Sequence, residues 1–242
     1  MSGPGGRQSA RSFSGESGEQ MMKPHISVCI PVYQGASTLA ATLRSVLASA
    51  RADFEVVIRD NGSTDGTSDV IAGFDDPRIR LIRSEETLPL PANWRATVEQ
   101  ARGELIKVVC ADDLIHPDCL ATQATLLEDP SLALVACRRD FIDGNGRILT
   151  RNAGLPRLLG RRGVSEVARA TVRFGINPVG EPACVMFRRR DYDAIGGFDG
   201  SNVFVMDIDS WLRILTRGDM FGQPEAHAAF RIWTESFSNS HN

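Results

Sequence analysis

The sequence lacks cysteines and histidines spaced as in a disulfide framework or a metal site. There are five cysteines, an odd number, and no two of them have C-x-x-C spacing. This argues against a disulfide-rich fold and a structural zinc site. The four histidines are scattered along the chain. We expect the cysteines to be buried as small apolar residues, the histidines to be structural or at the surface, and the compartment to be a reducing cytoplasm.

Long apolar runs and a surplus of basic residues are also missing. No run approaches the roughly 20 residues that a helix needs to cross a bilayer. Residues 1–23 are rich in Gly and Ser without an apolar h-region, so we expect a flexible tail rather than a secretory signal, with a short targeting role left open. The net charge is −3, which gives no reason to expect a nucleic acid partner.

Three common nucleotide or ester motifs are absent. No G-x-x-x-x-G-K-[ST] or G-x-G-x-x-G pattern opens a helix after a strand, which argues against a P-loop enzyme and a dinucleotide-dependent oxidoreductase. No G-x-S-x-G elbow indicates an esterase. The Gly-rich loop with Arg and Lys that a sugar-nucleotide pyrophosphorylase would need is missing as well.

Strand and helix patterns alternate through the first half of the chain. An apolar run at 25–32 predicts a strand, followed by a helix that Ser37 can cap. Further strands are expected at 54–60, 79–83 and 105–110, with helices at 64–74, 93–102 and 117–128. This alternation predicts an α/β fold with an open, mostly parallel sheet flanked by helices, which binds ligands at the carboxyl ends of its strands.

The second half is less regular. Strands at 132–143 and 148–150 read as a hairpin around Asn145-Gly146. We expect a loop at 151–163, a helix at 165–174, a short strand at 183–187 and a helix at 207–217. We predict a single domain over 24–242, with a nucleotide-sugar-binding half at 24–128 and an acceptor-side half at 129–242.

Three acidic motifs are the candidates for catalytic or binding residues, and each also has a purely structural interpretation. Asp60 begins the segment DNGSTDG, which suits a turn or a nucleotide pocket where a carboxylate accepts a ring N–H. Asp112-Asp113 are either solvated loop residues or ligands for Mg²⁺ or Mn²⁺. Asp207 and Asp209 are either favourable acids in a first helical turn or a general base, and their spacing lets only one face a site.

In this order, the three motifs resemble those of family 2 glycosyltransferases, which have the GT-A fold. The matching stretches are IPVYQGASTLAATLRSVLAS, VVIRDNGSTDGT, ELIKVVCADDLIHPDCL, IGGFDG and MDIDSWLRIL. The resemblance spans residues 26–238. It implies an inverting, metal-dependent transfer from a nucleotide-diphospho-sugar, with UDP or dTDP expected, to a hydroxyl of a glycan or lipid-linked glycan in surface polysaccharide assembly.

The resemblance also implies a role for particular residues. Pro31, Tyr33, Asp60 and Asp112 would bind the nucleotide, Asp113 would hold the metal, and Asp207 would be the catalytic base. Met206 stands where relatives often have Glu, so Glu181 and Asp209 stay as acceptor-side alternatives. Trp233 replaces a His that is common near the metal and is the candidate for stacking, whereas Trp94 and Trp211 are expected in the core.

These departures keep open a second interpretation, a non-catalytic module that binds nucleotide-sugars. The short basic runs at 138–139, 161–162 and 188–190 are read as solvated surface, with phosphate binding as the alternative. A peripheral contact with the inner face of the membrane through such loops stays open. The residues leave the sugar, the linkage and the oligomeric state undetermined.

Overall fold

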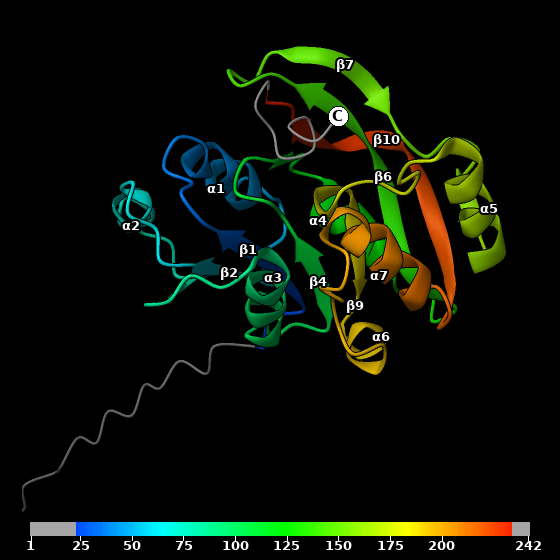
Figure 1. Ribbon diagram of the computed structural model, residues 1–242, viewed down its shortest axis with the longest axis horizontal. Coiled ribbons are helices and arrows are strands. Elements are labelled where there is room, and N and C mark those ends of the chain that lie inside the picture. Colours follow the sequence, from blue (N-terminus) through cyan, green and yellow to red (C-terminus); the bar gives the residue numbers. More distant parts are fainter. Residues whose placement is uncertain (1–22, 234–242) are drawn as a thin grey trace, which may run out of the picture.

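The computed structural model describes residues 23–233, which form an α/β architecture with a central sheet flanked by helices (Figure 1). Residues 1–22 of the expected tail lie outside the described residues. The same holds for the part of the family resemblance that follows Trp233. Within them the sheet has ten strands. Their order is β3-β2-β1-β4-β9-β6-β10-β5, with β7 paired to β6 and β8 paired to β10. The expected α/β class is confirmed.

The first half of the chain forms the parallel part of the sheet. Its strands are β1 (Ile26–Val32), β2 (Phe54–Asp60), β3 (Ile79–Arg83) and β4 (Leu105–Val108). The helices between them are α1 (Leu39–Leu47), α2 (Thr67–Ala72) and α3 (Leu90–Glu99). Every residue of β1 is buried, because β2 and β4 pair with it on either side and the helices cover it. The carboxyl ends of these strands therefore meet at one edge.

The chain after β4 adds antiparallel pairings to the same sheet, and one parallel pair, between β6 and β10. It contains β5 (Leu114–Ile115), α4 (Cys119–Leu126), β6 (Leu132–Ile142), β7 (Ile148–Ala153), β8 (Gly160–Arg162), α5 (Val164–Phe174), β9 (Val185–Arg188), α6 (Arg189–Ala194), α7 (Met206–Ile214) and β10 (Asp219–Arg231). β9 pairs antiparallel with β4 and with β6, and so joins the two halves. Two 3₁₀ turns, η1 (Pro182–Cys184) and η2 (Val203–Val205), precede β9 and α7. The predicted hairpin is confirmed as β6 and β7.

Several expected boundaries are wrong. The expected loop at 151–163 contains the end of β7 and all of β8. The long strand β10 was not predicted, because its Gly222 and Pro224 are typical of turns. A register shift between Gly222 and Ala226 accommodates them beside β6. Helix α3 starts at Leu90, with a proline in its first turn, and Ser37 caps no helix because Thr38 takes the N-cap position of α1.

The core runs along the whole sheet. Trp211 of α7 is fully buried, as expected, and its ring lies 5.7 Å from that of Phe187 on β9. All five cysteines are free thiols, and only Cys110 is partly exposed. Within residues 23–233 no helix is long and apolar enough to span a membrane.

Candidate functional site

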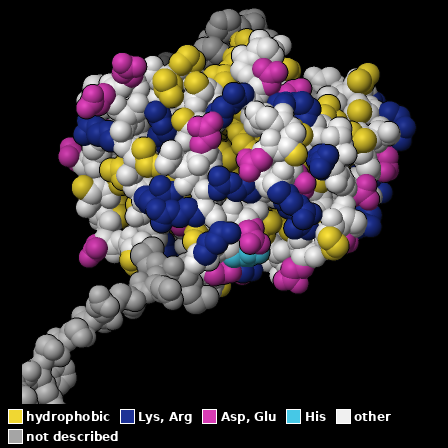
Figure 2. Space-filling model, turned by 90° about the horizontal axis from the view of Figure 1, so that it is seen from below, with side chains coloured by type: hydrophobic (Ala, Val, Ile, Leu, Met, Phe, Trp, Pro, Cys, Tyr) yellow, Lys and Arg dark blue, Asp and Glu magenta, His cyan; other side chains and the backbone are white. Residues whose placement is uncertain are grey.

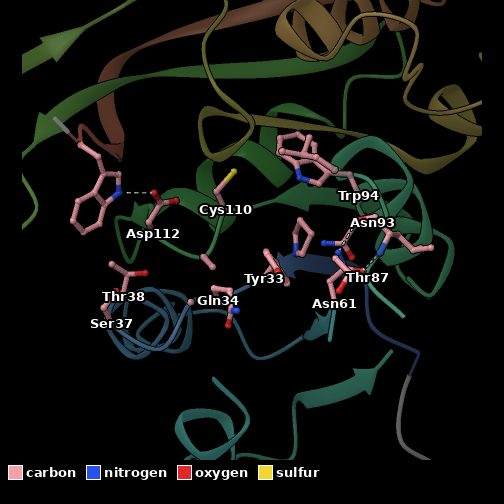
Figure 3. Close-up of a pocket in the computed structure, with 16 residues that line it drawn as sticks. Tyr33, Gln34, Ser37, Thr38, Asn61, Thr87, Asn93, Trp94, Cys110 and Asp112 are labelled. Atoms are coloured by element: carbon pink, nitrogen blue, oxygen red, sulfur yellow. Dashed lines mark hydrogen bonds between the residues drawn. The ribbon is translucent and has the colours of Figure 1, made fainter. Parts of the chain in front are cut away.

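A cavity of about 560 Å³ lies at the carboxyl ends of β1 and β4 (Figure 3). Parallel strands converge there, and the loops that follow them form its walls. Figure 3 shows Tyr33, Asn61 and Trp94 on one side and Thr38 and Asp112 on the other. The lining residues are Pro31, Tyr33, Gln34, Gly35, Ser37, Thr38, Asn61, Thr87, Leu88, Leu90, Asn93, Trp94, Cys110, Ala111, Asp112 and Trp233.

The predicted nucleotide-side residues Pro31, Tyr33 and Asp112 all line this cavity. Tyr33 is 54% exposed, so its ring is available for stacking. Trp94 also lines the cavity instead of lying fully in the core, and its ring packs edge-on against Phe198 at 5.4 Å. With Trp233, three aromatic side chains therefore border the cavity.

Asn61 was missed by the sequence reasoning, although it directly follows Asp60. Its side-chain oxygen accepts from the backbone N–H of Leu88 at 2.9 Å, and its amide nitrogen donates to the Leu88 carbonyl at 2.9 Å. This pair of bonds fixes the 84–89 loop as a wall of the cavity. The signal was an Asn after a strand, a position where amides commonly hold turns.

Asp60 lies beneath the cavity and does not line it. It is fully buried, and its carboxylate accepts from the Ser63 N–H and the Ser68 hydroxyl, both at 2.9 Å. Gly62 and Gly66 have φ values of +79° and +92°, which the turn requires and which glycine adopts freely. Asp60 thus holds the turn that presents Asn61, and its contact with a nucleotide base stays a prediction.

Asp112 and Asp113 follow β4 but have different surroundings. Asp112 faces the cavity and accepts a hydrogen bond from the Trp233 indole N–H at 3.0 Å. Asp113 is fully buried; its Oδ1 accepts from the Arg231 backbone N–H at 3.2 Å, while its Oδ2 has no partner. Burial and then the charge of Asp112 raise the pKa of Asp113 well above its usual value. A cation bound at Oδ2 would give this oxygen a partner and offset the negative charge of the carboxylate.

The surroundings of Cys110 show that two of the three acidic motifs, those of Asp112-Asp113 and Asp207, converge, together with Glu181. Burial raises the pKa of this thiol most, and the negative charges of nearby carboxylates raise it further. These carboxylates belong to Asp113, Asp112, Asp207 and Glu181. Three separate segments of the chain, after β4, before η1 and in α7, therefore bring their acids together next to the cavity.

Asp207 and Asp209 point in different directions, as their spacing predicts. Asp207 accepts from the Asn177 side-chain amide at 2.8 Å and from the Ile208 N–H at 2.7 Å. Burial raises its pKa, and these hydrogen bonds lower it by a smaller amount. Asp209 instead accepts from Arg213 at 2.8 Å, and Arg213 also donates to the carbonyl of Gly197. Of the two, the structure brings only Asp207 to the acidic cluster.

Glu181 is paired with a buried arginine. The Arg139 Nε lies 2.5 Å from Glu181 Oε2, and Arg139 Nη2 donates to Oε1 at 3.0 Å. Burial nevertheless raises the pKa of Glu181, because the charge of Arg139 offsets only part of the desolvation. This pairing occupies Arg139, one of the arginines considered for phosphate binding.

Another basic run lies far from the cavity. Arg188, Arg189 and Arg190 line a separate hollow with Lys23 and Arg102, at the edge where β1 and β4 begin. Figure 2 views the molecule from below and shows Lys and Arg side chains gathered across that face. Because the cavity is at the opposite ends of the same strands, this run does not contact a donor bound there.

The acidic residues fit a Mg²⁺ or Mn²⁺ ion that completes its shell with phosphate and water oxygens. Asp113 offers a buried oxygen without a partner, and Asp112 lies beside it at the cavity wall. Residues 23–233 contain no group of three potential metal ligands. Divalent ions in nucleotide sites are commonly held by only one or two carboxylates, so the residues present fit this role.

Comparisons with known proteins agree with this geometry. Residues 27–196 match the Glycosyl transferase family 2 model. The chain is 35% identical over 204 residues to the uncharacterized protein MT1568 of Mycobacterium tuberculosis, covering 81% of this chain and 63% of that protein. It is 29% identical over 126 residues to the succinoglycan biosynthesis protein ExoO of Rhizobium meliloti, covering 52% and 36%.

Two solved structures share the fold. TarS of S. aureus in complex with UDP-GlcNAc superposes with a TM-score of 0.72 at 16% identity, covering 90% of this chain and 61% of that one. The mannosyltransferase PcManGT of Pyrobaculum calidifontis, in complex with GDP-Man and Mn²⁺, gives 0.67 at 18% identity, covering 90% and 59%. The chain thus spans less than two thirds of MT1568 and of both solved chains. The family model matches most of the chain, and the GT-A type fold and the converging carboxylates agree with it. The chain therefore belongs to glycosyl transferase family 2.

Proposed function

We propose that this protein is an inverting, metal-dependent glycosyltransferase that moves a sugar from a nucleotide-diphospho-sugar to an acceptor hydroxyl. The observation that carries the proposal is the group of four carboxylates around Cys110, beside a cavity lined by aromatic rings. A diphosphate donor needs a cation near its phosphates, and an acceptor hydroxyl needs a base; this cluster offers carboxylates for both tasks.

UDP or dTDP is the donor nucleotide that we propose. Tyr33 and Asn61 border the part of the cavity where a base would lie, and Asp60 supports the turn between them. The structural neighbours carry UDP-GlcNAc in one case and GDP-Man with Mn²⁺ in the other, which supports a nucleotide-sugar without selecting the base. A bound Mg²⁺ or Mn²⁺ at Asp113, with Asp112 beside it, would stabilise the negative charge that develops on the leaving diphosphate.

Residues of the chain would then accept the proton and orient the base. The acceptor oxygen forms a bond to the anomeric carbon as the bond from that carbon to the diphosphate oxygen breaks, so the configuration inverts. Asp207 takes the acceptor's proton, and the hydrogen bond from Asn177 fixes the orientation of its carboxylate. The raised pKa of Asp207 makes it a stronger base once ionised than an exposed carboxylate.

We propose a glycan or lipid-linked glycan as the acceptor, in surface polysaccharide assembly. One relative is a succinoglycan biosynthesis protein. Another, 25% identical over 128 residues, is a glucosyltransferase of Escherichia coli whose name gives a diphosphoundecaprenol-linked GlcNAc as its acceptor. We also propose that residues 24–242 act as one domain, since a single sheet runs through both halves of the described part. We propose the cytoplasm as its compartment.

The test is transfer and slow donor hydrolysis with a panel of UDP-, dTDP- and GDP-sugars and Mn²⁺. Asp207→Asn should lower kcat by about 100-fold or more while leaving donor binding intact, because it removes the base alone. Asp209→Asn is the matched control: it changes the same residue type on the same helix, but Asp209 faces Arg213. If every donor binds and none turns over in the unmodified protein, the non-catalytic binding module is the correct interpretation.

A further inference from the structure

The outer surface of the second half is rich in arginine and nearly free of acids. Residues 147–174 contain seven arginines and a single acidic residue, Glu166, in a chain whose net charge is −3. This segment forms β7, β8 and α5, and in Figure 1 α5 lies at the edge of the molecule far from α1, α2 and α3. These arginines therefore form a basic region that is separate from the hollow lined by Arg188, Arg189 and Arg190.

Ion pairs neutralise part of this charge, but not the charge of the two arginines on α5. Ion pairs join Arg161 to Asp129, Arg162 to Glu166 and Arg151 to Asp140. Arg169 and Arg173 are exposed on α5 and form no salt bridge with any residue in the described part of the chain. These two arginines give the end of the helix a net positive charge.

Exposed apolar side chains accompany these arginines. Val172 is 85% exposed and lies on the face of α5 that also carries Arg169. Ile176 is 59% exposed and follows Gly175, the left-handed residue that ends the helix. The Phe174 ring is partly exposed, with the Arg173 guanidinium 6.0 Å from its centroid. Helix α5 has eleven residues and buries only Val167 and Ala170. Apolar and basic side chains on an outward face are typical of a helix that lies in a membrane interface.

This surface is directly connected to the proposed base. Asn177, which donates to Asp207 at 2.8 Å, follows Ile176 in the chain. On the other side, Val205 of η2 precedes Asp207 by two residues and is also exposed. Both segments that meet at the Asp207 carboxylate therefore present apolar side chains to the outside.

We propose that the end of α5 docks on a lipid surface with anionic headgroups. Val172, Phe174 and Ile176 would enter the interfacial layer, while Arg169 and Arg173 would meet the headgroup phosphates. Docking would hold the segment that carries Asn177, the partner of Asp207, close to the bilayer, where a lipid-linked acceptor presents its sugar. This last step rests on the proposed function, whereas the docking itself rests on the exposed residues.

The experiment is co-sedimentation of the full chain with vesicles of phosphatidylglycerol and phosphatidylcholine, compared with phosphatidylcholine alone. Arg169→Gln with Arg173→Gln should lower the partition coefficient by about 30-fold, since each arginine near an anionic surface contributes about fivefold. Val172→Ser with Ile176→Ser should lower it by about tenfold. Arg44→Gln with Arg83→Gln is the matched control, because both arginines are exposed in the other half, and should leave binding unchanged.

Equal binding to both vesicle types, or equal loss in the control pair, would overturn the proposal. Light scattering gives a further check: if the unmodified chain forms a dimer that Val172→Ser with Ile176→Ser dissociates, the surface binds a second copy and not a membrane. Hydrolysis of a soluble nucleotide-sugar is measured without vesicles for each variant. Vesicle binding without any turnover would refute the proposed function alone, and turnover without vesicle binding would refute the docking alone.

Discussion

Replacing Asp113 by Asn should stabilise the metal-free protein while removing its response to metal. In the folded chain the Asp113 Oδ2 is buried without a partner, next to the charge of Asp112. Leaving a buried polar group unsatisfied costs about 1–3 kcal/mol, and more when it is charged. Asn keeps the acceptor for the Arg231 N–H and removes the charge. Its amide nitrogen takes the place of the partnerless Oδ2, so the expected gain of about 2 kcal/mol comes from the loss of the buried charge beside Asp112.

For a chain of this size, a gain of about 2 kcal/mol corresponds to a rise in Tm of about 4–8 °C. The assay is thermal unfolding followed by circular dichroism, in EDTA and then with Mn²⁺ and UDP. The unmodified protein should gain about 2.7 kcal/mol when ligand is present at 100 times its Kd, and Asp113→Asn should gain far less. Asp118→Asn, an exposed acid just before α4, is the control. An Asp113→Asn variant that is less stable than the unmodified chain in EDTA, or that keeps the full metal response, would refute this account of Asp113.

Three further predictions concern the cavity wall, the pH dependence of stability and a close backbone contact. Trp233→Phe should raise the KM for the donor several-fold with little change in Tm, because it keeps a ring at the cavity wall but removes the N–H that binds Asp112. An unchanged KM in steady-state kinetics would contradict this. Burial, followed by the charge of His116, lowers the pKa of His227 from 6.5, so its contribution to stability is present above about pH 6.5 and is lost as the pH falls. The fall in Tm between pH 7 and 5 should therefore be smaller in His227→Gln, and an equal fall in both proteins would exclude this residue. Gly103→Ala should lower the free energy of unfolding, measured by urea titration, by about 1–3 kcal/mol, since its Cβ would lie 2.6 Å from the backbone nitrogen of Ser27. Gly73→Ala is the control and should cost less, because its Cβ would meet its nearest atom at 3.3 Å.

The arrangement of the site follows from the direction of the strands. Parallel strands β1, β2 and β4 end at one edge, so residues that follow them in the sequence become neighbours in space. Asp207 reaches the same place from the far end of the chain, because α7 packs on the second half of the sheet and Asn177 holds its carboxylate. The same topology separates Arg188–Arg190 from the cavity, since these residues lie where the strands begin.

Local patterns were enough to predict the helices and the longer strands of the first half, though not the two-residue strand β5. β1 and β3 match the expected ranges closely, because apolar runs between turn residues read as strands whatever lies beside them. β10 could not be predicted in this way. Its Gly222 and Pro224 favour a turn locally, and they are accommodated only because β6 pairs with the strand on either side of a register shift.

The sequence by itself determined the α/β class, the order of the acidic motifs and the opposite directions of Asp207 and Asp209, because these depend on periodicity and spacing within a few residues. Tertiary structure alone decided that Asp60 holds a turn, that Asn61 and Trp94 form the cavity wall, and that Glu181 pairs with Arg139. These features depend on which distant segments come into contact, and burial and partner charges are set by those contacts and not by neighbours in the chain.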